Sequence, residues 1–543
     1  MLNTEINEFS VSSELTQVAS YFSIIDNAIK TGDTNKIYKI STQQCEAAPA
    51  PFQLGSWTTI PLSPQGDNMV DLYNSFMTVD LKIPAITGTT SKDPFPNFSG
   101  TNASDAPALF NKPALWFGFK DAANIVGQYQ LVANGQTFYT QSFAIEESYL
   151  TSLATTEAVK HVDTFSKTTH KDVWRGKNTC RSGIIIDYDN KSSTDNVISL
   201  KIDFRRFLPL ATIKYIPDFI GNLEMRIKFS LDGLVVAPVG PEYICKGNPL
   251  QLHKIAMASG SENGITNKFV PYKALEIADS SIYGITAAAY ASNTLTLTAG
   301  NIGATISATP QIIRCESHLA CFGLDQNIYN QIASQYTQRA LSFPIQTMSF
   351  HQMNGNFGAA GGEYTPSLTA VPRFVDSIFI LFPKNSDYHT CFDNVMAERY
   401  QIKMGGYGTF PEVQYESWSP EFLEVSANVF NVNNDLTGFS KDVLKSLVNH
   451  SNNYRGFYSN DTSNFVLAIP TSTDNTFQQG QTSNTTINYL LHITLDSNSP
   501  FKASSTTTPI ICFLKDSVLA VQLRGNGAPP IVTLDEYDIT SPA

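Results

Sequence analysis

The stretch CESHLAC places Cys315, His318 and Cys321 at a C-x2-H-x2-C spacing. A structural zinc ion needs four sulfur or imidazole ligands in a tetrahedron, and the nearest further candidate is His351. On a β-strand the side chains alternate, so Cys315 and Cys321 would share one face with Ser317 while His318 would point away. The spacing therefore predicts a half-buried strand in preference to a zinc site.

Two carboxylate pairs raise the question of glycoside hydrolysis, which needs two carboxyl groups about 5–10 Å apart. Glu146 and Glu147 are neighbours in a helical pattern, so their side chains would point apart. Asp187 and Asp189 could share a strand face, but they end an apolar run where a turn is favoured. We expect structural or capping roles for both pairs.

Other sites of chemistry are weaker. His161 and His170 bracket HVDTFSKTTH, which is typical of solvated loop histidines. The chain has no phosphate-binding G-x-x-x-x-G-K-[ST] loop, no G-x-S-x-G elbow and no H-E-x-x-H zinc motif, and NVNNDLTG and DYDN lack the glutamate that closes a calcium loop. N-x-[ST] sequons occur in this Asn-, Ser- and Thr-rich chain, and without a secretory signal we expect no glycosylation at Asn97, Asn102, Asn190, Asn449, Asn460 or Asn484. The sequence therefore predicts no catalytic, cofactor-binding or metal-binding residue, and a protein that is not an enzyme.

Composition limits the class of protein. At 543 residues the chain exceeds the size of one hydrophobic core, so two or more domains are expected. Only 15% of residues are charged, which predicts that much of the surface meets protein in place of water. The net charge is -12 and the 36 cationic residues are scattered, which argues against binding of a nucleic acid duplex by the folded body.

Nothing in the hydropathy pattern predicts a membrane span, and the acidic start MLNTEINEF does not resemble a signal peptide. The cysteine number is odd and the cysteines form no dense framework. We therefore expect reduced, buried thiols in an intracellular assembly environment. They lie at positions 45, 180, 245, 315, 321, 391 and 512.

Strand patterns dominate the chain. FMTVDLKIP places Met77, Val79 and Leu81 on one face, and NLEMRIKFSL alternates in the same way. Further candidates are GIIIDYD, VISLKIDF, FVDSIFILFP, SNFVLAIP, INYLLHITL and IICFLKDSVLAVQLRG. Helical patterns are few: AIEESYLTSLATTEAVKHV, SKDVLKSLVNH and, near the N-terminus, SELTQVASYFSIIDNAIK.

Four stretches of the first half have counterparts later in the chain, in the same order. QYQLVANGQTF and RYQIKMGGYGTF begin at Gln128 and Arg399, which are 271 positions apart (399 − 128). VDLKIP matches IFILFP at an offset of 299, LKIDF matches LAIPT at 267, and NLEMRIKF matches NYLLHITL at 266. In both halves a helical stretch follows the match of QYQLVANGQTF with RYQIKMGGYGTF. The pattern predicts an internal duplication; two unrelated β domains with similar alternation are the alternative.

Two consecutive β domains with an inserted helix resemble the double jelly-roll major capsid proteins, and FRRFLPLATIKYIPDFIGNLEMRIKFSL resembles a pattern in virophage and polinton-like virus capsid proteins. This resemblance implies an all-β fold of two consecutive eight-stranded jelly rolls with short inserted helices and long surface loops. We expect an N-terminal arm at 1–35, a first roll at 36–235, a connector and surface insertion at 236–310, and a second roll at 311–543. The insertion includes a hairpin in TLTLTAGNIGATIS.

The implied function is that of a major capsid protein. Three copies would supply six similar rolls in a closed ring, so the expected partners are the chain itself as a homotrimer, neighbouring capsomers, and penton and minor capsid proteins. The expected location is the virion, with assembly inside the host cell. The alternative is a carbohydrate-binding or carbohydrate-active β-sandwich protein, because 23 Tyr and 34 Phe residues could stack on sugars.

Overall fold

The computed structural model describes the strands, helices and short connections of the chain, and all statements below concern these residues. They are 25–31, 34–48, 51–64, 69–82, 87–88, 114–118, 122–153, 165–168, 172–174, 183–187, 197–213, 215–230, 235–239, 274–276, 285–291, 294–299, 304–308, 311–338, 341–352, 363–364, 367–368, 375–382, 397–404, 466–470, 489–495, 509–522 and 529–535.

The first β body consists of two antiparallel sheets. One sheet has the order β1 (Thr34–Gln44), β20 (Gln311–Leu324), β4 (Met69–Lys82), β12 (Val197–Asp203). In the other, the order is β3 (Trp57–Pro61), β14 (Leu223–Phe229), β7 (Val126–Ala133), β8 (Gln136–Gln141). Numbered by their place in the chain, these strands follow 1-8-3-6 and 2-7-4-5, which is the order of a jelly roll.

Period-two alternation explains why these strands enclose a core. Met77, Val79 and Leu81 of β4 are buried, as are Met225 and Ile227 of β14, and all five belong to one hydrophobic cluster. Polar residues alternate with them along both strands. The alternation predicted from the sequence is confirmed in both.

The second β body repeats this arrangement. Its first sheet has the order β21 (Leu341–Gln352), β28 (Ile510–Gln522), β24 (Val375–Leu381), β26 (Leu467–Pro470). In its other sheet, β27 (Tyr489–Leu495) lies between β25 (Ala397–Met404) and two short strands, β22 (Glu363–Tyr364) and β23 (Ser367–Leu368). Because β22 and β23 pair with β27 in one continuous register, they occupy one strand position.

The strand registers support the internal duplication. Leu223 pairs with Ala133, and Tyr489 pairs with Met404, so the two offsets (489 − 223 = 266 and 404 − 133 = 271) equal those of the sequence match. As far as they are described, the four matched stretches lie in corresponding strands, but the register relates β4 to β24 by an offset of 301 (380 − 79) in place of the 299 of the sequence match. The mainly antiparallel β fold is confirmed. The count of eight strands per body stays a prediction, because one position of the second body lies outside the described residues.

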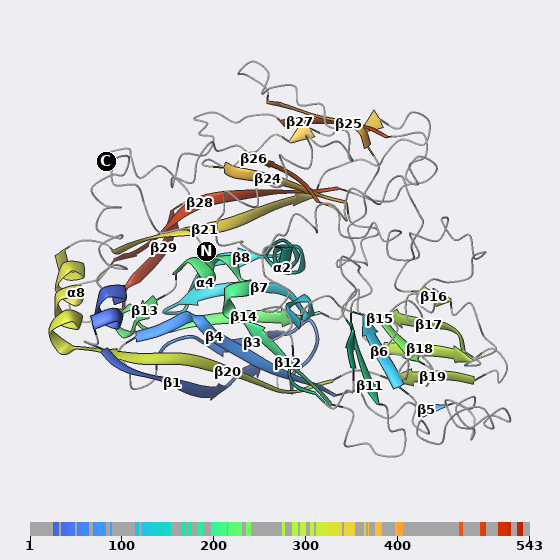
Figure 1. Cartoon of the computed structure of the whole chain (residues 1–543), viewed down its shortest axis with the longest axis horizontal. Helices are drawn as coiled ribbons and strands as arrows, with labels where there is room; N and C mark the ends of the chain where they lie inside the picture. Colours follow the sequence, from blue (N-terminus) through green and yellow to red (C-terminus); the bar gives the residue numbers. More distant parts are fainter. Residues whose placement is uncertain are drawn as a thin grey trace.

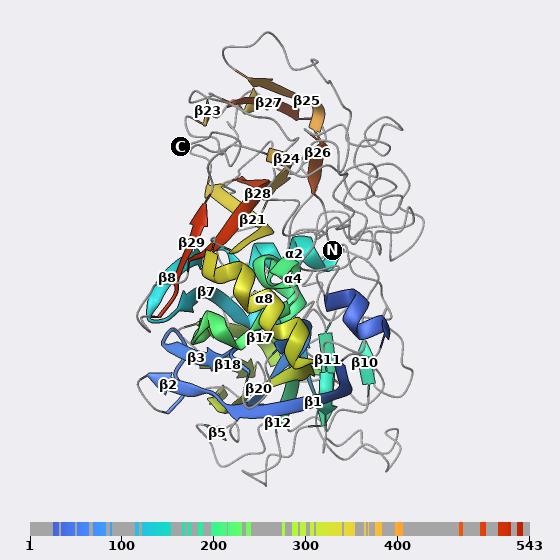
Figure 2. The same ribbon diagram turned by 90° about the vertical axis from the view of Figure 1, so that its left-hand side faces the viewer.

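The four sheets are stacked as layers (Figure 1). The β1-β20-β4-β12 sheet is the lowest layer, and the second body lies above the first in both this view and the view turned by 90° (Figure 2). Two helices, α2 (Ala144–Leu153) and α4 (Leu208–Ile213), lie between the two bodies. The predicted helix at AIEESYLTSL is therefore confirmed, and SKDVLKSLVNH lies outside the described residues.

A third helix, α8 (Gln326–Gln338), connects β20 to β21 at one end of the molecule (Figure 2). The sequence analysis missed it. Residues 25–31 are helical and lie beside it, and Ile25 and Ala28 are buried in the main core cluster. The last part of the expected N-terminal arm therefore packs on the first body, and the bounds of the arm stay a prediction.

The predicted domain boundary at residue 311 divides a sheet. Strand β20 begins there, yet it pairs with β1 and with β4 across most of its length. The segment 236–310 is therefore an insertion between β14 and β20 of the first body, and the connection between the bodies is the α8 segment. The insertion itself contains the predicted hairpin, since β18 (Thr294–Ala299) pairs with β19 (Ala304–Ala308).

The long loops of the first body meet beside it (Figure 1). Strand β4 ends where β12 and β20 begin, so the loops attached there leave from one end. They form two small sheets. One contains β10 (Asp172–Trp174), β11 (Gly183–Asp187), β6 (Ala114–Gly118) and β15 (Val235–Val239). The other contains β16 (Ala274–Glu276), β17 (Ile285–Ala291), β18, β19 and β5 (Thr87–Gly88).

Short elements complete the sheets. Strands β2 (Glu46–Ala48), β9 (Phe165–Thr168), β13 (Tyr215–Pro217) and β29 (Ile531–Asp535) extend the main sheets, and 3-10 turns η3 (Ala122–Ile125), η4 (Phe204–Arg206) and η5 (Asp218–Ile220) link strands of the first body. Among the described helices, none is both long enough and apolar enough to cross a membrane.

Candidate functional site: two equivalent sheet faces

The first sheets of the two bodies can be superposed residue by residue through their registers. Leu200 pairs with Val79, and its sequence counterpart Leu467 pairs with Ile380. One residue earlier on β4 and on β24, Thr78 corresponds to Phe379. Their partners on the next strand, Glu316 of β20 and Cys512 of β28, correspond in the same way. Each outward-facing residue of the first body therefore has a partner position in the second.

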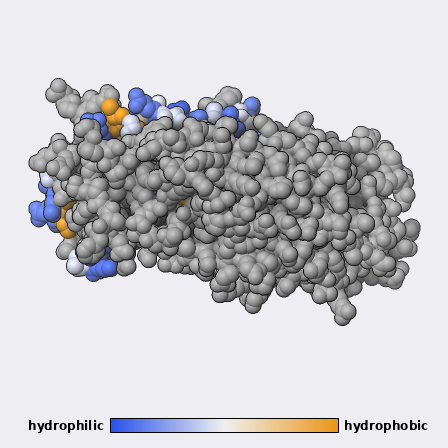
Figure 3. All heavy atoms as spheres, turned by 90° about the horizontal axis from the view of Figure 1, so that it is seen from above, coloured by the Kyte–Doolittle hydropathy of each residue, from blue (hydrophilic) through white to orange (hydrophobic). Residues whose placement is uncertain are grey.

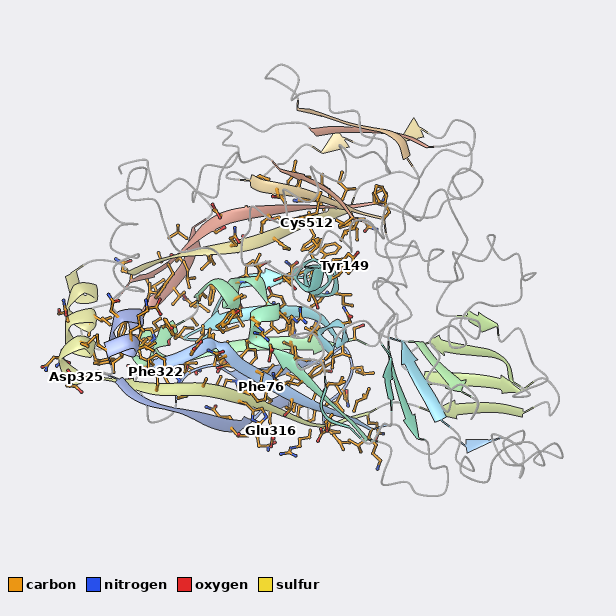
Figure 4. The ribbon with its side chains drawn as sticks, in the orientation of Figure 1. Phe76, Tyr149, Glu316, Phe322, Asp325 and Cys512 are labelled. Carbon is orange, nitrogen blue, oxygen red and sulfur yellow. The ribbon has the colours of Figure 1, made fainter. Side chains whose placement is uncertain are left out.

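We call the outer face of the second body's first sheet the junction face. Its residues form a buried apolar cluster with Tyr149 and Leu150 of α2 and Leu208 of α4. In Figure 4, Tyr149 and Cys512 lie on the two sides of this contact. The junction face consists of Met348, Phe350, Phe379, Leu381, Val466, Ala468, Ile510, Cys512 and Leu514.

The equivalent outer face of the first body is polar, and we call it the polar face. In Figure 4, Phe76 and Glu316 mark it on the lowest layer. Its residues lie at the positions that correspond to the residues of the junction face, together with Phe76, which corresponds to Ser377 of β24. They are Thr42, Gln44, Phe76, Thr78, Asp80, Ser199, Lys201, Arg314, Glu316 and His318. The same fold thus carries one apolar and one polar copy of a single surface.

His318 organises one half of the polar face. Its imidazole stacks on Phe76 with ring centroids 4.7 Å apart, and the hydroxyls of Thr42 and Thr78 lie 2.9 Å from Nδ1 and Nε2, respectively. Lys201 Nζ lies 4.8 Å from the Phe76 ring centroid. Desolvation by burial lowers the pKa of His318, and the charge of Glu316 opposes this shift. A mainly neutral imidazole is therefore expected near pH 7.

Charges organise the other half. Arg314 Nη2 donates to Glu316 Oε2 at 2.6 Å, and Arg314 Nη1 lies 4.0 Å from Asp80 Oδ2. Ser199 also donates to Asp80, and Gln44 donates to Glu316. The hydrogen bond with Glu316 is the main cause that raises the pKa of Arg314. The Arg314 side chain is 55% exposed, whereas the Glu316 side chain is 5% exposed, so the guanidinium faces solvent and the carboxylate is buried.

A buried polar cluster crosses the contact between the bodies. Tyr139 and Gln141 of the first body donate to the carbonyl of Met348 of the second, at 3.4 and 3.0 Å. Beside them, Glu147 accepts hydrogen bonds from the Tyr129 hydroxyl at 2.9 Å and from the Leu208 N–H at 2.7 Å. Because Leu208 begins α4, Glu147 supplies a hydrogen-bond acceptor at the start of that helix.

Burial dominates the ionisation of this cluster. It raises the pKa of Glu147 to about 7, although the hydrogen bonds from Leu208 and Tyr129 act in the opposite direction. The pKa values of Tyr129 and Tyr139 are also raised, first by burial and then by the charge of Glu147. Burial, followed by the charges of Glu147 and Glu146, raises the pKa of the Cys512 thiol on the junction face. A proton on Glu147 therefore stabilises the contact at neutral pH and below.

The predicted metal and acid residues do not converge. Cys315 and Cys321 are buried on β20 while His318 lies on its outer face, as the alternation predicted, and His351 lies on β21 against Phe513. Within the described residues, no group of three potential ligands could hold a metal ion. Glu146 and Glu147 are both buried on α2, and Glu147 has a structural role.

The remaining candidates are not placed. Asp187 ends β11, and nothing is described of its side chain. His161, His170, Asp189 and all six sequon asparagines lie outside the described residues. The sequence analysis missed Phe76, Tyr129 and Gln141. The aromatic Phe76 on the polar side of an alternating strand was the signal that could have drawn attention to the first of these.

The sheets and faces together define an antiparallel β protein made of two bodies with one strand order and with unlike outer faces. No protein-family model and no curated protein sequence matches the chain. Among solved structures it is similar to the Sputnik virophage structure, with 10% identity, TM-score 0.45, and coverage of 92% of this chain and 89% of that chain. It is also similar to the PBCV-1 virus capsid, with 10% identity, TM-score 0.44, and coverage of 92% and 97%. The mavirus major capsid protein gives 10% identity, TM-score 0.41, and coverage of 94% and 96%.

Proposed function

We propose that this chain is a major capsid protein whose role is structural: three copies form a pseudo-hexameric ring, and such rings tile the icosahedral shell of a DNA virus. The observation that carries the proposal is the repetition of one sheet order in two bodies whose equivalent outer faces differ, one apolar and covered, the other polar.

The stacking direction supports a ring. Within the chain, the α2 and α4 side of the first body covers the junction face of the second. If the same step is repeated, the second body of one copy covers the polar face of the next copy. A head-to-tail contact of this kind closes into a ring when the rotation permits, and three copies place six β bodies in it.

The polarity of the two faces fits two kinds of contact. A face that contacts another part of the same chain is covered during folding, so it can be apolar. A face that contacts another copy is exposed to water before assembly, and exposed apolar patches promote nonspecific association. Complementary charges such as those of Arg314, Asp80 and Glu316 give specificity and a dependence on salt.

The described surface agrees with a chain that is soluble before it assembles. In the view from above, the described residues at the surface are mainly hydrophilic, with small hydrophobic spots (Figure 3). Among the described residues, Ile313 is the large hydrophobic side chain that is exposed, at 47%, and it lies beside Arg314 on β20. This position would bury Ile313 at the edge of the contact between copies.

The two small sheets beside the first body would form the projection of the ring. They are built from insertions between β4 and β7, between β8 and β12, and between β14 and β20. In the second body, the connections from β24 to β25 and from β27 to β28 are shorter. Further partners would be neighbouring rings and the penton and minor proteins of the shell, and the chain would reside in the virion after assembly in the host cell.

The mass of the purified protein in solution tests this function. We expect about 180 kDa, three times the 59.6 kDa of one chain. Arg314→Glu, which places a third acid beside Glu316 and Asp80, should shift the mass towards one chain. Arg226→Glu is the matched control, because Arg226 also lies two residues from its glutamate, Glu224, but on the other sheet.

Two results would contradict the proposal. One is a stable single chain for the unmodified protein at physiological salt (about 0.15 M) as well as at low salt. The other is a single chain that binds oligosaccharides, which would favour the carbohydrate-binding alternative. If Arg314→Glu leaves the assembled ring intact, the proposal of a ring stands, but the polar face is not the contact between copies.

A further inference from the structure

Cys45 and Cys315 form a cross-strand pair inside the first body. The register of β1 and β20 pairs Gln44 with Glu316, so the next residues, Cys45 and Cys315, stand opposite each other. The Cys45 N–H donates to the Cys315 carbonyl at 3.0 Å, which continues the ladder by one step. Both side chains are buried, and both cysteines are free thiols.

The geometry of this pair is that of a disulfide precursor. Directly opposed residues of antiparallel strands have Cα atoms about 4.5–5.5 Å apart, which lies inside the range of about 4.4–6.8 Å found for disulfides. A side-chain hydrogen bond to Cys45, followed by burial, raises the pKa of the Cys315 thiol, which agrees with two side chains that face each other.

The location of the pair gives a bond between these thiols a mechanical effect. Strand β1 is the edge of its sheet and pairs only with β20 within the described residues. An edge strand held by one partner is the first to separate from a sheet. A covalent link at the end of β1 would hold that edge to β20, the strand that carries Arg314, Glu316 and His318.

The second body shows that the fold does not require this pair. At the equivalent place His351 stands opposite Ile511, and the His351 ring packs against Phe513. A packing requirement for small apolar side chains would be met by alanine, serine or valine on both strands. The opposed thiols are therefore particular to the first body, and packing alone does not explain them.

We propose that Cys45 and Cys315 are an oxidisable pair, which stays reduced in a reducing compartment and forms a disulfide when a low-molecular-weight disulfide of the glutathione class becomes the oxidant. The thiolate of Cys45 attacks the small disulfide, forming a mixed disulfide and releasing one small thiol. The Cys315 sulfur then loses its proton, attacks the Cys45 sulfur and expels the second small thiol.

The atoms and electrons of this exchange balance. Two protein thiols are oxidised to one disulfide, one small disulfide is reduced to two small thiols, and the two protons move from the protein to the small thiols. We assign the first attack to Cys45, because its residue is 6% exposed while Cys315 is 0% exposed. The rate should follow the opening of the β1 edge. The inference does not depend on the proposed function.

The experiment uses the full chain, freed of reductant and incubated with oxidised glutathione. The protein is quenched in acid, alkylated, digested without reduction and analysed by mass spectrometry. We expect a linked peptide that joins Cys45 to Cys315, a higher thermal midpoint than that of the reduced protein, and reversal of both by dithiothreitol. Cys45→Ser should abolish the linked peptide, and Cys321→Ser, on the same strand, should keep it.

Three results would overturn the inference. Cys45 could accumulate as a stable mixed disulfide while Cys315 remains a thiol. Both could remain thiols in the folded protein under conditions in which the urea-unfolded chain is oxidised. Cys315 could also be found linked mainly to a cysteine other than Cys45. Because the first two results are read on the unmodified protein, a variant that fails to fold does not affect the test.

Discussion

The junction face and the polar face are the same surface used twice. Where β20 carries Arg314, Glu316 and His318, β28 carries Ile510, Cys512 and Leu514. Both strands bury apolar residues on their other face, such as Leu319 and Phe513, and Ser317 and Lys515 are buried as well, so the clearest difference between the bodies lies on the outer faces. Divergence after duplication thus changed what covers each sheet and left the strand order unchanged.

The difference also separates two energetic regimes. Each fully buried aliphatic or aromatic side chain of the junction face contributes about 1.5–3 kcal/mol through removal of apolar area from water. An ion pair that is open to solvent on one side, such as that of the exposed Arg314 with Glu316, contributes about 1 kcal/mol. The first face should therefore determine whether the chain folds, while the second should affect association far more than folding.

The largest expected effect comes from a charge on the junction face. Phe379→Asp removes an aromatic side chain from the cluster and buries an unpaired carboxylate, so the free energy of unfolding should fall by about 4 kcal/mol or more. Denaturant unfolding measures this loss. The matched variant is Thr78→Asp at the equivalent position of the polar face, which loses the hydrogen bond with His318 and places a carboxylate opposite Glu316, so a smaller loss of about 1–2 kcal/mol is expected. Equal losses in the two variants would refute the distinction between the faces.

The next effect concerns the carboxyl beside the junction. With its pKa raised from 4.5 to about 7, Glu147 binds its proton more tightly in the folded chain than in the unfolded chain. The associated stability is fully present below pH 4.5 and is lost as the pH rises through 7, by about 3 kcal/mol in total. Glu147→Gln lacks this proton, so the difference in unfolding free energy between the two proteins should change by that amount between pH 4.5 and 8. A difference that does not vary with pH would contradict the raised pKa.

A smaller effect tests the polar links between the bodies. Asn134 occupies a left-handed backbone conformation in the Asn-Gly turn between β7 and β8, and its side-chain amide donates to the carbonyls of Ile220 and Pro530. Asn134→Gly keeps that backbone conformation and removes the side-chain bonds, so we expect a loss of about 1–2 kcal/mol in thermal or denaturant unfolding. Full stability in this variant would show that the link to the segment before β29 contributes nothing.

The smallest effect on folding is expected for Arg314→Ala. The variant removes the cationic partner of the buried Glu316 carboxylate, which keeps its hydrogen bond from Gln44, so the unfolding free energy of the single chain should fall by about 1 kcal/mol. Association should respond more strongly, with weaker assembly that no longer depends on salt to the same degree. Sedimentation at several salt concentrations measures the second quantity. A large loss of folding stability without any change in assembly would reverse the roles that we assign to the two faces.

Much of the fold could be predicted because it depends on local patterns. The alternation in β4 and β14 identifies their core residues, and the matched stretches identify corresponding strands even at low similarity. The continuous apolar run IICFL in β28, beside the alternating RCESH in β20, was also a signal that one strand is buried on both sides and the other on one.

The parts that could not be predicted depend on contacts between distant residues. Strand β20 follows the 236–310 insertion in the chain, so only its pairing with β1 and β4 shows that it completes the first body. Helix α8 has few apolar residues, although Asp325 before it and the spacing of Ile328 and Ile332 were available signals. The cluster around Glu147 is assembled from five elements, β7, β8, α2, α4 and β21, and has no sequence motif.

An electron cryomicroscopy reconstruction of the purified oligomer tests the central claim most directly. The account predicts a ring of three copies with six β bodies, in which the second body of each copy covers the β1-β20-β4-β12 face of the next. A reconstruction in which that face is open to solvent, or in which the chain remains single, would contradict it.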